Sequence, residues 1–240
     1  GRAPAAWSPT HFAGRESMPR SGWDTVTVPG CVSAWAEVSS RFGKLPFARL
    51  FEPAVRYAES GYLVGPVTAH AWAGAAEALG AFEGFAQTFL PKGRAPRVGE
   101  RFSCQAQART LQQIAETQGE DFYRGALAAE MADDAARLGG QLTEDDLAAH
   151  RCDWVGTIKQ DYRGYQLHEI PPNGQGLGAL LCLGILRHLD VGSLPVDSAD
   201  SLHVQIEAMK LALADAYRYV ADPAYMDVSV EDLLDESYLE

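Results

Sequence analysis

Residues 154–189 read WVGTIKQDYRGYQLHEIPPNGQGLGALLCLGILRHL, and this stretch does most to decide the fold. Its first half predicts two strands, 154–161 and 165–170, on either side of the turn signal Tyr162-Arg163-Gly164. Two consecutive prolines then end the second strand, since proline lacks the N–H that a strand interior needs. The apolar run 176–189 predicts a helix. Strands and helices are therefore mixed in this part of the chain.

Helical patterns dominate the rest of the chain. Apolar residues recur every three or four positions, and proline or glycine marks several segment ends. These patterns predict helices at 32–42, 46–60, 66–79, 105–117, 122–138 and 201–220. Thr143, followed by three acidic residues, is predicted to cap another helix, and the alternation of Thr and Val at 25–28 predicts a short strand. The predicted fold class is α+β, mostly helical.

The charge balance excludes some classes of partner. Lys and Arg total 20 and Asp and Glu total 32, which gives a formal net charge of −12. Such a field repels phosphate backbones and anionic lipid, so the sequence disfavours binding to nucleic acid or to a membrane. The longest uncharged runs are interrupted by Gly and Pro and are shorter than the roughly 20 residues that span a bilayer. Residues 1–240 are expected to form a single domain, and the sequence leaves the compartment open.

No cofactor or metal site is predicted. The six histidines never lie three or four residues apart, so no pair of metal ligands is visible. Residues 174–178 resemble a dinucleotide-binding turn, but no βαβ unit surrounds them, and we interpret the glycines as allowing close packing. Four cysteines, none in a C-x-x-C pair, are expected to be free and mostly buried: Cys31, Cys104, Cys152 and Cys182.

Thr10 beside His11 is a possible nucleophile and base, because a histidine can activate a neighbouring hydroxyl. Neighbouring side chains on an extended chain point to opposite sides, which argues against this role. The chain opens on Gly1 without an initiator Met. We interpret the sequence as a piece of a longer polypeptide.

Several segments, taken in order, resemble the large subunit of gamma-glutamyltransferases. They are GRAPAA at 1–6, VPGCVSAW at 28–35, FGKLP at 42–46, PAVRYAESGY at 53–62, FYRG at 122–125, DYRGY at 161–165, IPPNGQG at 170–176, EAMKLA at 207–212 and Asp222-Pro223. The resemblance covers nearly the whole chain. Residues 170–176 depart from the usual Pro-Pro-Pro-Ser-Ser-Gly form and look like an acylase-like bacterial branch.

The resemblance implies an N-terminal-nucleophile hydrolase with an αββα sandwich, of which this chain would be a mostly helical portion. In that family a precursor cuts itself into large and small subunits. The new N-terminal Thr of the small subunit attacks a γ-glutamyl amide and passes the acyl group to water or an amine. This chain would then be an interior part of the large subunit, without the nucleophile or any other catalytic residue.

Arg2 is the substrate-binding residue that the resemblance implies, where it would hold the α-carboxylate of the glutamyl group. A planar guanidinium suits this task because it forms two parallel hydrogen bonds to a carboxylate. The implied partners are the small subunit of the same precursor and a γ-glutamyl small molecule, in a heterotetramer or larger assembly. Two alternatives remain open: a related amide acylase of the cephalosporin or glutaryl type, and a non-catalytic helical binding module.

Overall fold

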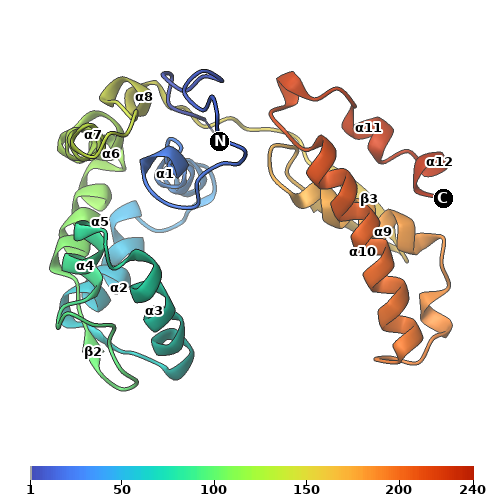
Figure 1. Ribbon diagram of the computed structural model, residues 1–240, viewed down its shortest axis with the longest axis horizontal. Helices are drawn as coiled ribbons and strands as arrows, with labels where there is room; N and C mark the ends of the chain where they lie inside the picture. The colour runs from blue at the N-terminus through green and yellow to red at the C-terminus, as the bar shows by residue number, and fades with distance from the viewer. Residues whose placement is uncertain (1) are drawn as a thin grey trace. The chain divides into compact units, whose positions relative to one another are not determined.

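A computed structural model describes residues 2–240 of the chain (Figure 1). Gly1, the first residue of the segment 1–6, lies outside the described residues. The chain divides into two units, Gly1–Cys152 and Asp153–Glu240, each with its own hydrophobic core. The single domain expected for 1–240 stays a prediction. Helices predominate and the strands are few, as the α+β class predicts.

The first unit is built mainly from helices. They are α1 (Cys31–Phe42), α2 (Phe47–Ser60), α3 (Pro66–Leu79), α4 (Glu83–Phe89), α5 (Gln105–Thr117), α6 (Glu120–Arg124), α7 (Ala126–Arg137) and α8 (Glu144–Ala149). Two short strands, β1 (Tyr62–Leu63) and β2 (Arg101–Phe102), pair antiparallel. The helices predicted at 32–42, 46–60, 66–79 and 105–117 are confirmed as α1, α2, α3 and α5. Sequence patterns missed α4 and both short strands.

The core of the first unit is formed by one apolar face of most of these helices. α2 and α5 pack along each other, and α6, α7 and α8 form a neighbouring cluster. The buried side chains include Val32, Phe51, Ile114, Leu127 and Leu147. Leu147 is fully buried, so the short helix α8 is held by packing although it has little stability of its own.

Two predictions for this unit were wrong. The helix predicted at 122–138 is broken at Gly125, whose backbone is extended. The carboxylate of Asp121 accepts the N–H of Ala126 at 2.8 Å and so takes the place of a helical hydrogen bond. The predicted strand at 25–28 is absent from the described chain, where a 3₁₀ turn, Trp23–Thr25, leads into an extended segment.

The second unit contains a hairpin and two longer helices. Strands β3 (Ile158–Tyr162) and β4 (Tyr165–Glu169) pair antiparallel, with Tyr162 opposite Tyr165, and confirm the predicted hairpin. Arg163 and Gly164 both have positive φ, which is the conformation of a two-residue hairpin turn. The remaining helices are α9 (Gly176–Arg187), α10 (Ala199–Tyr219), α11 (Val230–Leu233) and α12 (Glu236–Leu239).

Helices α9 and α10 lie side by side (Figure 1). Small residues on α10 (Ala208, Ala212 and Ala216) are buried against the apolar side chains of α9. The glycines that open α9 serve this packing: a Cβ on Gly176 would collide with the side chain of Glu169, and one on Gly178 would touch Ala216. Both contacts support the interpretation of 174–178 as a close-packing turn. No helix in the described part of the chain is both long and apolar enough to span a bilayer.

Candidate functional site

Arg2 lies at the carboxyl end of helix α8. Its backbone carbonyl accepts a hydrogen bond from Val28 N at 2.9 Å, and its Nη1 donates to the carbonyl of Ala149 at 3.1 Å. Three residues further on, the Ala5 N–H donates to Oδ1 of Asp146 at 2.8 Å. Arg2 itself is exposed to solvent. Its exposed guanidinium is therefore carried on a segment that α8 anchors.

Asp146 connects the segment that carries Arg2 to the start of α8. Thr143 caps the helix, as predicted, and accepts the Asp146 N–H at 3.2 Å. In return, Oδ2 of Asp146 accepts from Thr143 N at 3.0 Å and from Thr143 Oγ1 at 2.8 Å. The Asp146 carboxylate is buried, at 8% exposure, and these three contacts with Ala5 and Thr143 satisfy it.

Three arginines converge on the last carbonyls of α8. Besides Arg2, Arg124 Nη2 donates to the carbonyl of Ala148 at 3.1 Å. Arg151 Nη1 donates to the carbonyls of Ala148 and His150, both at 2.6 Å. Positive charge at this end of a helix is favourable because it offsets the helix dipole. Arg2 thus has a structural contact here whether or not it also binds substrate.

A polar pocket of about 760 Å³ lies beside α1, α6 and the chain that follows α8. Its lining includes Ser33, Glu37, Glu116, Glu120, Arg124, His150, Arg151 and Cys152. Ser33 Oγ is 2.8 Å from His150 Nε2, and Cys152 Sγ donates to Ser33 Oγ at 3.0 Å. Ser33 Oγ also donates to the carbonyl of Gly30 at 2.8 Å. A thiol, a hydroxyl and an imidazole therefore meet at one edge of this pocket.

Tyr123 fixes the imidazole at that edge. The two rings are stacked, with centroids 5.1 Å apart and an interplanar angle of 21°. The Tyr123 hydroxyl donates to the carbonyl of Pro29 at 2.8 Å and accepts the N–H of Ser33 at 3.1 Å. Burial raises the pKa of Tyr123 above its ordinary value, so the phenol stays protonated and keeps donating. The start of α1 is thereby tied to α6.

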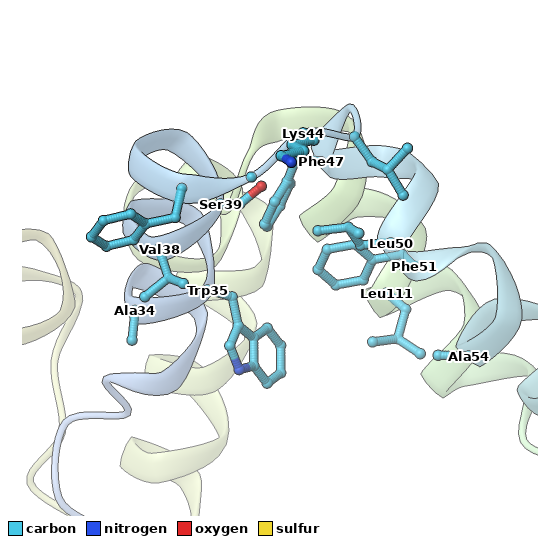
Figure 2. A pocket seen from close by; sticks show the side chains of 13 residues that line it. Ala34, Trp35, Val38, Ser39, Lys44, Phe47, Leu50, Phe51, Ala54 and Leu111 are labelled. Atoms are coloured by element: carbon cyan, nitrogen blue, oxygen red, sulfur yellow. The ribbon is translucent and has the colours of Figure 1, made fainter.

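An apolar groove of about 800 Å³ separates α1 from α2. In Figure 2, Trp35 and Val38 from α1 line one side of the groove, and Leu50 and Phe51 from α2 line the other. Trp35 is 46% exposed and Val38 52%. Contiguous exposed apolar surfaces of this kind occur at protein–protein interfaces, at membrane contacts and in ligand-binding grooves.

His11 contacts an acid. Its Nε2 lies 2.8 Å from Oδ1 of Asp24, and Arg15 Nη2 donates to the other carboxylate oxygen at 2.7 Å. The hydrogen bond from His11 lowers the pKa of Asp24, and the Arg15 hydrogen bond and charge lower it further. This ion-paired cluster gives His11 a structural partner other than Thr10.

The four cysteines are free thiols, as predicted, but they are not mostly buried. Cys31 is exposed, Cys104 and Cys152 are half-buried, and only Cys182 of these four is buried. Burial raises the pKa of the Cys182 thiol. Within residues 2–240, His, Cys, Asp and Glu side chains form no group of three or more that could hold a metal ion.

Comparison with known proteins identifies the family. The family model described as gamma-glutamyltranspeptidase matches residues 1–240. The chain belongs to this family. Its mostly helical α+β fold is the one that the segments resembling gamma-glutamyltransferases predict.

Two curated relatives and one solved structure illustrate the proteins to which this chain is similar. A glutathione hydrolase-like YwrD proenzyme from Bacillus subtilis is 36% identical over 95% of this chain. An oxamate amidohydrolase proenzyme from Klebsiella pneumoniae is 38% identical over 93%. The chain spans 43% of the length of each. A cephalosporin acylase from Bacillus halodurans matches the whole chain at 45% identity with a TM-score of 0.93, and the match covers 46% of that structure.

Sequence reasoning named Arg2 alone and missed the cluster in the polar pocket. Ser33 lies 117 residues before His150 and 119 before Cys152, so no local spacing connects them. The fold brings these side chains together by packing the segment after α8 against the first turn of α1.

Proposed function

We propose that this chain is part of a gamma-glutamyltransferase-like enzyme that cleaves γ-glutamyl amides of the glutathione type. The acyl group passes to water or to an amine through an N-terminal Thr on the small subunit. Such a Thr is a competent nucleophile because its own α-amine serves as the adjacent base, and the covalent intermediate divides amide cleavage into two easier steps.

The match of one family model along residues 1–240 carries this proposal. It is supported by the names of the relatives, which include glutathione hydrolases and an amidohydrolase, all described as proenzymes. In this proposal the present residues supply scaffold and substrate contacts, and the partner from the same precursor supplies the nucleophile.

Arg2 is proposed to bind the substrate's α-carboxylate. Its exposed guanidinium sits on an anchored segment, with Nη1 held by Ala149. In the complete enzyme, Arg2→Lys should raise the KM for a γ-glutamyl substrate about tenfold, because an ammonium cannot reproduce the two parallel hydrogen bonds. An unchanged KM would remove Arg2 from the substrate site.

Arg151→Lys is the matched control for the structural role of Arg2. Arg151 also donates to the last carbonyls of α8, at 2.6 Å, and no substrate contact is proposed for it. If Arg2 acts only by holding α8, the two lysine variants should change KM alike. If Arg2 binds substrate, only Arg2→Lys should change KM, with stability nearly the same in both.

A related amide acylase is the second candidate, because the 45% identity is to a cephalosporin acylase. A glutaryl amide keeps the terminal carboxylate of a γ-glutamyl amide and lacks only the α-amine, so Arg2 can hold either substrate and recognition of the α-amine distinguishes the two activities. The complete enzyme should be assayed on a chromogenic γ-glutamyl anilide and on the matching glutaryl anilide. A higher kcat/KM for the γ-glutamyl compound supports the proposal, and a higher value for the glutaryl compound supports the acylase.

The remaining part of the precursor is proposed to cover the exposed apolar surfaces, including the groove between α1 and α2. On α10, Leu202 and Ile206 are also exposed, at 47% and 55%, and they lie one turn apart. A chain of residues 1–240 produced alone should therefore associate in light scattering. A monodisperse monomer would count against a covering partner.

A further inference from the structure

Arg2 is held at two points, its backbone and its guanidinium. The N–H of Val28 donates to the Arg2 carbonyl at 2.9 Å, and Arg2 Nη1 donates to the Ala149 carbonyl at 3.1 Å. Val28 lies in the extended segment before α1, and Ala149 is the last residue of α8. The place of the guanidinium therefore depends on two segments that are far apart in the sequence.

Tyr123 contacts both of these segments. Its hydroxyl donates to the carbonyl of Pro29, the residue after Val28, at 2.8 Å. Its ring stacks on His150, the residue after Ala149, with ring centroids 5.1 Å apart. One side chain thus lies against the next residue along the chain from each of the two hydrogen bonds that hold the arginine.

The Tyr123 hydroxyl is buried and uses both of its hydrogen-bonding roles. It accepts the N–H of Ser33 at 3.1 Å while it donates to Pro29. That N–H belongs to the first turn of α1, where backbone donors have no helical partner. Tyr123 is 4% exposed, so these bonds are made largely away from water and are stronger for it. Loss of the hydroxyl would remove a donor and an acceptor at once and loosen the backbone beside Val28.

We propose that Tyr123 is a positioning residue for substrate binding, which acts by holding the two segments that fix the Arg2 guanidinium. This inference rests on the role proposed for Arg2 above. A guanidinium binds a carboxylate through two parallel hydrogen bonds, and such a geometry tolerates little displacement. No substrate contact is proposed for Tyr123 itself. Its effect is therefore on the binding of the substrate carboxylate, and the chemical step on the small subunit is left unchanged.

The experiment uses Tyr123→Phe in the complete processed enzyme, because phenylalanine keeps the stacked ring and removes only the hydroxyl. The KM for a γ-glutamyl anilide should rise about three- to tenfold, the effect of one hydrogen bond, with kcat nearly unchanged. Two analogues are measured as competitive inhibitors of that reaction: glutaryl anilide, which keeps the carboxylate, and γ-aminobutyryl anilide, which keeps only the amine. The inhibition constant should rise for the first and stay the same for the second. An equal rise for both would overturn the proposal.

A double variant tests whether Tyr123 acts through Arg2. If it does, Arg2→Lys combined with Tyr123→Phe should have the same KM as Arg2→Lys alone, because the guanidinium that Tyr123 positions is already gone. KM effects that multiply would show an independent action of Tyr123 and would overturn the proposal. A raised KM in Arg2→Lys with an unchanged KM in Tyr123→Phe would overturn this inference alone. An unchanged KM in both single variants would also remove Arg2 from the substrate site, so the two failures are distinguishable.

Ile114→Val is the matched control for stability. Ile114 is buried in the same core, at 3% exposure, and the change removes one carbon from it. Such a change costs about 0.5–1.5 kcal/mol, close to the loss of one hydrogen bond, so both variants should lower the Tm by similar amounts. The KM of Ile114→Val should equal that of the wild type. A KM raised as much as in Tyr123→Phe would assign the effect to lost stability and overturn the positioning role.

Discussion

Asp146→Ala should loosen the segment that carries Arg2. The change removes the acceptor for three hydrogen bonds: from Ala5 N at 2.8 Å, Thr143 N at 3.0 Å and Thr143 Oγ1 at 2.8 Å. A hydrogen bond to a charged group contributes about 1.5–3 kcal/mol, and such terms do not add fully within one network. We expect a loss of about 3 kcal/mol in the free energy of unfolding, which lowers the Tm by roughly 6–12 °C.

Hydrogen–deuterium exchange on the complete enzyme gives the local measurement for this variant. The Ala5 amide should exchange about ten- to a hundredfold faster, because its acceptor is gone. Asp145→Ala is the matched control: Asp145 is the exposed neighbour in the same helical turn, and its loss removes only a favourable helix-dipole charge of about 0.3–1 kcal/mol. Equal effects of the two variants on Tm and on Ala5 exchange would refute the anchoring role of Asp146.

Two further predictions concern packing and pH. Gly184→Ala should destabilise the enzyme by about 1–3 kcal/mol in thermal unfolding, because a Cβ there collides with the Leu239 side chain. Gly178→Ala on the same helix meets only an ordinary contact and should be neutral or slightly stabilising, and equal losses would contradict this packing. Glu100→Gln should lower Tm at pH 7, because the hydrogen bond from Arg94 holds the pKa of Glu100 far below its usual range. The Tm difference between the wild type and Glu100→Gln should shrink as the pH falls below about 4.3, where Glu100 of the unfolded chain protonates. A Tm difference that does not change with pH would contradict this stabilising role of the Glu100 carboxylate.

Periodicity predicted the helices well where one apolar face repeats without interruption. The patterns at 32–42 and 105–117 coincide with α1 and α5 almost residue for residue. The pattern at 122–138 did not show the break, because the apolar repeat continues across Gly125. The break depends on the hydrogen bond from the Ala126 N–H to the Asp121 carboxylate. Local hydrogen bonding of this kind leaves no trace in the hydrophobic pattern.

The candidate sites were harder to predict from the sequence than the fold was. Arg2 came from the resemblance to a family, and its contact with the end of α8 became visible only in three dimensions. Ser33, His150 and Cys152 carry no shared local motif, since the fold brings them together across more than a hundred residues. Hydrophobic patterning reports on which face of an element is buried, and it contains no information about which distant polar side chains meet.

The central claim is that these residues belong to a precursor whose chemistry is completed by a nucleophile that self-cleavage exposes. Intact mass spectrometry with N-terminal sequencing of the full-length gene product tests this most directly. We predict two chains, of which the first contains residues 2–240 and the second begins with Thr. A product that stays a single uncleaved chain while it hydrolyses γ-glutamyl amides would contradict the claim.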